Sequence, residues 1–152
     1  MIEHYFAYGS NMNPTRVAAR GLRVVRIQPA LLKDFSLLFD KLTPGPPQSG
    51  HANVAPQRGA TVEGVLYELA GIDEIYKMDP FEKAPVNYGR DVIGVHTNDG
   101  PVNTWVYFAN SALRVAGLSP TRDYLTHLLE GRPYLSKDYF EWLRQTRCID
   151  EG

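Results

Sequence analysis

The chain has 152 residues, a length that suits one domain with a single sizeable core. Hydrophobic residues make up 43% of it and charged residues 22%, which excludes wholesale disorder. The chain has 16 basic and 17 acidic residues, and a net charge of −1 gives no indication of nucleic-acid binding. We interpret four arginines that lie close together in the sequence as solvated surface, in preference to a phosphate-binding patch: Arg16, Arg20, Arg23 and Arg26.

No segment approaches the ~20 apolar residues that a membrane span requires. The first residues lack the basic and apolar regions of a signal peptide. Cys148 is the one cysteine in the sequence, so no intramolecular disulfide forms, which fits a reducing compartment. We therefore expect a soluble cytoplasmic protein with a single domain over residues 1–152 and no membrane or nucleic-acid partner. The sequence gives no indication of the oligomeric state.

Strand-like runs dominate the first two thirds of the chain. Gly64 suggests a bulge in one of them, and Asp99-Gly100 is a hairpin signal between the last two. The segment Leu22–Phe39 fits either two short strands or one long bent strand. The expected strands are His4–Tyr8, Leu22–Leu32, Phe35–Phe39, Thr61–Leu69, Val86–His96 and Val102–Ala109.

Helices are fewer and lie mostly late in the chain. Asn13-Pro14 and Ser119-Pro120 each combine a capping residue with a proline suited to the first helical turn, and Ser136 is a further N-cap. The expected helices are Thr15–Arg20, Ile72–Met78, one after Ser119-Pro120 that ends before Gly131, and one after Ser136. We expect Leu42–Gly59, rich in proline and glycine, to be a long loop of the kind that is usually functional or mobile. The predicted fold is α+β, with a small mixed, mainly antiparallel, barrel-like sheet and a few flanking helices.

The first strand runs into a glycine turn, Tyr8-Gly9-Ser10-Asn11, directly before a helix start. Glycine permits a positive φ and a close approach of the backbone, and consecutive N–H groups in such a turn form an anion-binding concavity. The turn lacks the lysine and second glycine of a P-loop, which disfavours nucleotide binding. The alternative is a plain strand-to-helix turn capped by Ser10 or Asn11.

Glu82 stands between Pro80 and Pro85, on an expected loop, with Phe81 as an apolar neighbour. A carboxyl near apolar surface has a raised pKa and becomes a useful acid–base group. The alternative is a surface glutamate paired with Lys83 or Lys77.

Together these stretches resemble the gamma-glutamylcyclotransferase-like family, whose signature is a strand that ends in Tyr-Gly-Ser-Asn. Asp79-Pro80-Phe81-Glu82 is similar to the family's Asp-x-x-Glu stretch, which ends in the catalytic glutamate. Further segments are similar in the same order, so the resemblance covers residue 5 to about residue 130: Ala52-Asn53-Val54, Val62–Tyr67, Tyr88 and Arg90. Two positions depart from the pattern, since Lys83 stands where glycine is frequent and Met78 where leucine is common.

The resemblance implies a cyclisation in which the α-amine of a γ-glutamyl compound attacks its own γ-carbonyl and releases 5-oxoproline and an amine. It implies that Glu82 is the general base and acid, and that no cofactor or metal takes part. The four histidines show no metal-ligand spacing either. The implied substrate-binding residues are Tyr5, Phe6, Ala7, Tyr8, Gly9, Ser10 and Asn11, together with Tyr107 and Tyr124, whose alternative role is packing in the core.

The implied partner is a small γ-glutamyl molecule. Two other interpretations stay open at this point: a catalytically idle binding module on the same scaffold, and an interaction protein in which the motif survives only as a turn.

Overall fold

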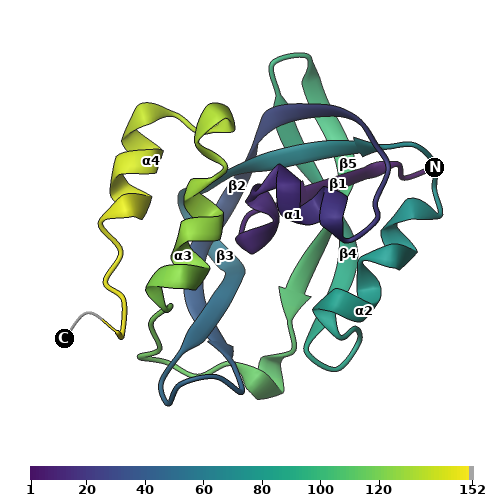
Figure 1. Ribbon diagram of the computed structural model, residues 1–152. Helices are drawn as coiled ribbons and strands as arrows, with labels where there is room; N and C mark the ends of the chain where they lie inside the picture. Colours follow the sequence, from purple (N-terminus) through teal and green to yellow (C-terminus); the bar gives the residue numbers. More distant parts are fainter. Residues whose placement is uncertain (151–152) are drawn as a thin grey trace.

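Five strands close into a barrel in the order β1-β3-β2-β4-β5 in the computed structural model, which describes residues 1–150 (Figure 1). β1 pairs antiparallel with β3 and parallel with β5, so the sheet is mixed, and the other pairs are antiparallel. The strands are β1 (His4–Ala7), β2 (Val24–Leu42), β3 (Gly50–Leu69), β4 (Tyr88–Thr97) and β5 (Gly100–Ala109).

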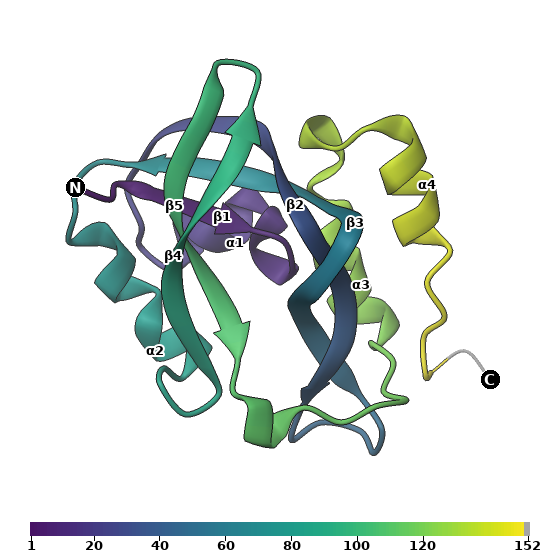
Figure 2. The same ribbon diagram turned by 180° about the vertical axis from the view of Figure 1, so that it is seen from behind.

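Helices flank the barrel on two opposite sides. α3 and α4 lie together on one flank and α2 on the other, with α1 across the face between them (Figures 1 and 2). The α-helices are α1 (Pro14–Ala19), α2 (Asp79–Glu82), α3 (Arg122–Leu129) and α4 (Lys137–Arg144). Short 3₁₀ helices span Ser10–Met12, Glu74–Lys77, Ser111–Leu113 and Arg132–Tyr134. The predicted α+β class with a small barrel-like sheet is therefore confirmed.

β2 and β3 form one long hairpin, which decides one expectation and corrects another. Of the two alternatives for Leu22–Phe39, the structure has the single long strand, because β2 is continuous with three irregularities in its pairing. The expected loop Leu42–Gly59 is wrong for most of its length, since β3 already begins at Gly50. Pro56 pairs with Phe35 directly beside one irregularity, a position at which a strand tolerates proline.

Gly64 is not at a bulge, because its register with Ala30 is regular. A Cβ atom at this position would lie 2.5 Å from the Ala7 carbonyl oxygen and 2.6 Å from the Phe6 ring. Such a distance is shorter than any ordinary contact, so Gly64 allows β1 to lie closely against β3. This close approach fixes the strand that leads into the Tyr8–Asn11 turn.

The helix starts follow the capping signals with one exception. Asn13 accepts a hydrogen bond from the Thr15 backbone and Ser136 one from Tyr139, as an N-cap should. The third cap is Thr121, not Ser119, since Thr121 accepts the hydrogen bond from the Tyr124 backbone. Ile72–Met78 is a 3₁₀ turn over Glu74–Lys77, and Glu82 belongs to the helical turn α2 where a loop was expected.

The core fills the barrel and the space beneath α1 and α3. Its largest fully buried side chains include Phe6, Met12, Leu32, Leu66, Tyr67, Leu125 and Leu128. Met12 and the α3 leucines belong to this core, which anchors the turn after β1 from the side opposite the sheet. No helix in residues 1–150 is long and apolar enough to cross a membrane.

Candidate active site

A cavity of about 40 Å³ that is partly open to solvent lies where the end of β1 meets α2. All the residues that the sequence singled out line it: Tyr5, Phe6, Ala7, Tyr8, Gly9, Ser10, Asn11, Glu82, Tyr107 and Tyr124. Ala52 and Tyr88 complete the lining. The structure thus brings together segments that are up to 119 positions apart in the chain.

Asn11 is the centre of the hydrogen-bond network in this cavity. Its side-chain Nδ2 donates to the Tyr5 hydroxyl at 2.8 Å and to Glu82 Oε1 at 3.0 Å. Its Oδ1 accepts from Arg20 at 3.1 Å, and its main-chain oxygen accepts from the Tyr67 hydroxyl at 2.6 Å. Asn11 is 3% exposed. A buried amide with all its groups satisfied holds a single orientation, so the Glu82 carboxylate is held in place by the turn after β1.

Glu82 is half-buried and reaches the cavity from the last residue of α2. Burial raises the pKa of its carboxyl above the usual range, while the charges of Arg20 and Arg16 and the Asn11 hydrogen bond lower it in part. This agrees with the raised pKa expected for a carboxyl near apolar surface. The alternative pairing with Lys77 is not what the structure holds, since Lys77 donates to Glu74 at 2.7 Å.

Asp79, one turn before Glu82, has the opposite environment. Arg90 donates to both of its oxygens, at 2.8 and 3.0 Å, and the Tyr107 hydroxyl donates to Oδ1 at 2.6 Å. Burial alone would raise the pKa of Asp79, but these hydrogen bonds and the Arg90 charge outweigh it and lower the pKa. Asp79 is thus an anchor for the start of α2 and stays ionised.

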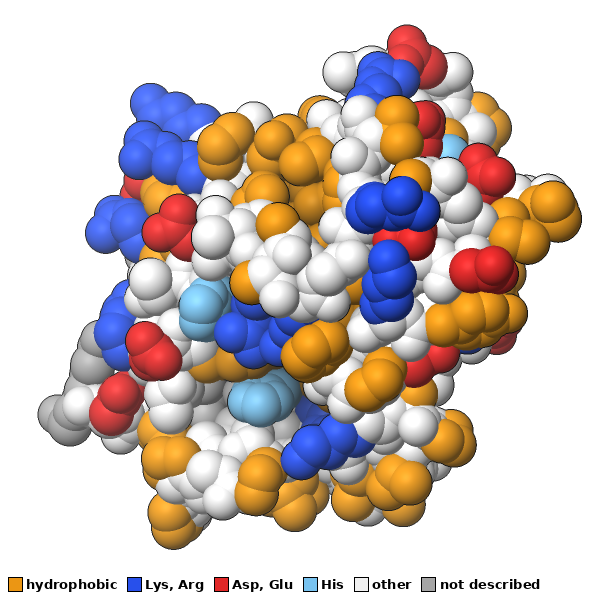
Figure 3. Space-filling model, turned by 45° about the vertical axis from the view of Figure 1, so that its right-hand side comes forward, with side chains coloured by type: hydrophobic (Ala, Val, Ile, Leu, Met, Phe, Trp, Pro, Cys, Tyr) orange, Lys and Arg blue, Asp and Glu red, His pale blue; other side chains and the backbone are white. Residues whose placement is uncertain are grey.

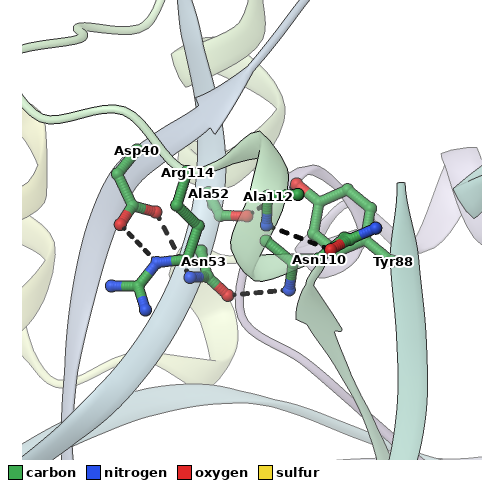
Figure 4. Close-up of polar contacts among 8 residues, drawn as sticks. Asp40, Ala52, Asn53, Tyr88, Asn110, Ala112 and Arg114 are labelled. Atoms are coloured by element: carbon green, nitrogen blue, oxygen red, sulfur yellow. Dashed lines mark hydrogen bonds and ion pairs between the residues drawn. The ribbon is translucent and has the colours of Figure 1, made fainter. Parts of the chain in front are cut away.

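Five tyrosines surround the cavity, and the hydroxyl of each is tied to a partner in the protein. Tyr8 donates to the Tyr107 carbonyl at 2.6 Å, and Tyr124 accepts from the Ala52 backbone at 2.9 Å. Tyr88 donates to the Ala52 carbonyl at 2.8 Å, beside an Asn53 that donates to Asp40 (Figure 4). Fixed hydroxyls leave the rings as a rigid wall, which favours one bound geometry of a small ligand.

The Gly9 turn differs from its predicted conformation. Its φ is −114°, so the expected positive φ is wrong. The requirement for glycine is one of space, because a Cβ here would lie 3.1 Å from Ala52 Cβ and 3.4 Å from the Tyr124 hydroxyl. The Ser10 and Asn11 N–H groups open the 3₁₀ helix Ser10–Met12, where no intrahelical acceptor is available. Donors of this kind suit an anionic oxygen.

Sequence reasoning missed the cations beside the cavity. Arg16 and Arg20 do not lie on a solvated surface, since both are half-buried and Arg20 reaches Asn11. Their spacing of four residues, which puts both on one helical face, was the available signal. Lys41 and His51 also approach the site, and no local pattern in the sequence indicates either of them.

His51 stacks on the Tyr124 ring, with 4.3 Å between ring centroids. Burial, together with the charges of Lys41 and Arg16, lowers the pKa of His51 to about 4. Within residues 1–150 no group of three or more His, Cys, Asp or Glu side chains is placed to hold a metal ion.

Comparison with known proteins places this fold and these motifs in one class. A model of the family described as "Gamma-glutamyl cyclotransferase, AIG2-like" matches residues 5–127. The chain belongs to the gamma-glutamyl cyclotransferase, AIG2-like family. No match was found among curated proteins.

Solved structures show the same fold. One named gamma-glutamyl cyclotransferase is 22% identical with a TM-score of 0.81, over 98% of this chain and 90% of the other. An uncharacterized protein from Homo sapiens is 23% identical with a TM-score of 0.82 and the same coverage. A yeast gamma-glutamyl cyclotransferase described as specific to glutathione is 13% identical with a TM-score of 0.70, over 92% and 93% of the two chains.

Proposed function

We propose that this protein is a γ-glutamyl cyclotransferase in which Glu82 is the general base and then the general acid. The observation that carries the proposal is the 3.0 Å hydrogen bond from Asn11 to Glu82, because it joins the Tyr-Gly-Ser-Asn turn to the Asp-x-x-Glu stretch in one cavity. Family membership supports the same reaction class.

The reaction needs no nucleophile from the protein. Glu82 takes a proton from the substrate's α-ammonium, and the freed amine attacks the γ-carbonyl carbon, so that a new C–N bond closes the five-membered ring. The tetrahedral intermediate then collapses, the bond to the departing nitrogen breaks, and Glu82 returns its proton to that nitrogen. The second proton of the attacking nitrogen also passes to the departing amine, which leaves as an ammonium ion. The products are 5-oxoproline and a free amine.

The raised pKa of Glu82 suits this exchange. An ordinary glutamate near ~4.3 and an α-amine near ~8 differ by about 5 kcal/mol in proton affinity. Burial of the Glu82 carboxyl narrows this gap. The N–H groups of Ser10 and Asn11 are the donors that we assign to a substrate oxygen, either the α-carboxylate or the developing oxyanion.

The remaining cavity residues position the substrate in this proposal. The Tyr5, Tyr8, Tyr107 and Tyr124 rings, with Phe6 and Ala7 behind them, hold the γ-glutamyl chain bent so that its amine faces its own carbonyl. Burial raises the pKa of Tyr124 to about 12, so its hydroxyl is neutral and supplies no charge. Gly9 leaves the space that the chain needs near Ala52.

The test is 5-oxoproline release from γ-glutamyl amino acids, γ-glutamyl amines and glutathione, measured for wild type and Glu82→Gln. Turnover that is present in wild type and lost in Glu82→Gln supports the proposal. Glu130→Gln, at an exposed position, is the matched control and should keep full activity. Saturable binding of these compounds without turnover in wild type would instead support an idle binding module.

A further inference from the structure

A second hollow adjoins the cavity and shares Ser10, Glu82, Tyr88 and Tyr124 with it. Four cationic side chains from different parts of the chain line this hollow, which we call the cationic vestibule: Arg16, Arg20, Lys41 and Lys83. Lysine and arginine side chains, with histidine beside them, surround a hollow on the face shown in Figure 3. Glu82 is the one carboxylate in the lining of the vestibule.

None of the four cations of the vestibule forms an ion pair among residues 1–150, in contrast to two other arginines that are partly buried. Arg90 and Arg114 each contact an aspartate at 2.8 Å. Arg16 has no ion pair among residues 1–150, and its buried Nε has no hydrogen-bond acceptor there. Lys41 is 3% exposed, and its ammonium donates to the Leu42 carbonyl at 2.7 Å but forms no ion pair in the part of the chain that the structure describes.

Buried cations without an anionic partner are energetically unfavourable. Taking a charge out of water without a partner is unfavourable, and an anion that enters beside it recovers much of that free energy. Arg20 already faces Asn11 and Glu82, so we match its charge to the Glu82 carboxylate. Arg16 and Lys41 then remain as positive charges withdrawn from water that a ligand could match, and Lys83, which is exposed to solvent, adds a third charge at the mouth.

The position of the vestibule places these cations beside the departing amine of the substrate and not beside its γ-glutamyl group. Under the proposed function, the turn after β1 and Glu82 hold the γ-glutamyl half, whose α-ammonium and α-carboxylate cancel. The departing amine therefore extends across Tyr88 and Tyr124 into the adjoining hollow. A departing amino acid with one carboxylate leaves two of the three cations unmatched, whereas one with two carboxylates leaves a single cation.

We propose that the cationic vestibule selects γ-glutamyl compounds whose departing amine carries two carboxylates, such as a γ-glutamyl derivative of glutamate or aspartate. This inference rests on the proposed function for its orientation of the substrate. Arg16 and Lys41 are the residues that contact the second carboxylate, and Lys83 adds its charge at the mouth.

Lys83 adds a second observation, because it is the left-handed C-cap of α2 and its side chain also lines the vestibule. Its φ is 49° and its ψ 47°, in the left-handed region that glycine adopts without strain and that costs other residues about 1–2 kcal/mol. The chain keeps a long cationic side chain at this strained position, beside the catalytic candidate. Strain that persists next to a site is grounds for a functional hypothesis.

The experiment compares γ-glutamylglutamate with γ-glutamylglutamine, which have nearly the same shape and differ by one negative charge. We expect kcat/KM to be at least tenfold higher for γ-glutamylglutamate, with the ratio falling as salt rises. Arg16→Gln and Lys83→Gln should each lower this ratio severalfold. Arg26→Gln, which removes an exposed partner of Asp99, is the matched control and should leave the ratio unchanged. Equal kcat/KM values in wild type would overturn the inference.

Binding separates this inference from the proposed function. The Kd of both compounds is measured by calorimetry on Glu82→Gln, in which the proposed chemistry is blocked. Tighter binding of γ-glutamylglutamate by tenfold or more, with no turnover by wild type, would refute the cyclotransferase and keep the charge selectivity. Turnover of both compounds without a difference in Kd would keep the cyclotransferase and refute the selectivity.

Discussion

The two ends of α2 each carry a carboxylate, and the structure treats them in opposite ways. Asp79, at the start, receives hydrogen bonds from Arg90 and Tyr107, and its pKa is lowered. Glu82, at the end, receives one hydrogen bond from Asn11, and burial raises its pKa.

Positive charge is present near both carboxylates, so its presence alone does not explain the difference. Arg90 meets Asp79 with two aligned N–H groups, whereas Arg20 is directed at the Asn11 oxygen and acts on Glu82 from farther away. Direct contact thus fixes the charge of one carboxylate, and the absence of such contact leaves the other able to exchange a proton. Two carboxylates whose pKa values move apart mark the division between structural anchor and acid–base candidate.

Glu82→Gln should have the largest effect on activity. It tests whether the carboxylate at the end of α2 exchanges a proton with the substrate. We expect kcat/KM to fall by about 10²–10⁴-fold, the usual contribution of a general base. Gln retains an oxygen for the Asn11 donor and removes a partly buried charge, so the melting temperature should equal or exceed that of wild type. A drop in melting temperature with activity retained would show that Glu82 is a structural anchor and not the acid–base group.

Lowering the pH should affect activity through Glu82 and stability through Asp79, in different pH ranges. The folded pKa of Glu82 is raised, so kcat/KM should fall about tenfold per pH unit below an acidic limb that lies above the ordinary value of 4.5. The folded pKa of Asp79 is lowered, so its contribution to stability is present above the unfolded value of 3.8 and disappears as the pH falls through the folded value. An acidic limb at or below 4.5 would contradict the environment described for Glu82.

Asp79→Asn tests whether the Asp79 carboxylate anchors the start of α2. The change removes the charge that Arg90 grips and should lower the free energy of unfolding by about 2 kcal/mol, as for hydrogen bonds to charged groups. Urea denaturation measures this loss. Asp99→Asn breaks the exposed pair with Arg26 and should change stability by less than about 0.5 kcal/mol. Equal losses in the two variants would show that the Asp79 pair anchors nothing.

Tyr107→Phe should have a smaller effect than Asp79→Asn. It removes the 2.6 Å hydrogen bond to Asp79 and leaves both Arg90 contacts in place. We expect a loss of about 1 kcal/mol in stability and a change of a few-fold in kcat/KM. A loss as large as that of Asp79→Asn would show that Tyr107, and not Arg90, holds the carboxylate.

Local signals in the sequence predicted the parts of the molecule that depend on neighbours in the chain. The Asp99-Gly100 hairpin, the Asn13 and Ser136 caps and the strand before Gly9 all appear where expected. The region before Gly59 was misjudged because its prolines and glycines indicate a loop, while in the structure Pro56 lies beside a pairing irregularity of a long hairpin.

The candidate site also contains residues that the sequence could predict and residues that it could not. Its motif residues could be named from the sequence through the resemblance to a family, and the structure places them around one cavity. The environment of Arg16 and Lys41 could not be predicted, because it depends on how α1 and the far end of β2 pack against α2. The same holds for Gly9, where the requirement for a small residue comes from Ala52 on another strand.

The parallel contact between β1 and β5 has a consequence for the order of folding. It joins Tyr5 to Trp105 across 100 positions, and the Tyr8 hydroxyl spans 99 positions to reach Tyr107. The β2–β3 hairpin is local by comparison, and closing long chain segments is slow because the entropy cost comes before the contacts form. We therefore expect the hairpin to form early and the cavity to assemble in the last kinetic phase, so recovery of ligand binding in a refolding experiment reports the closure of the barrel itself.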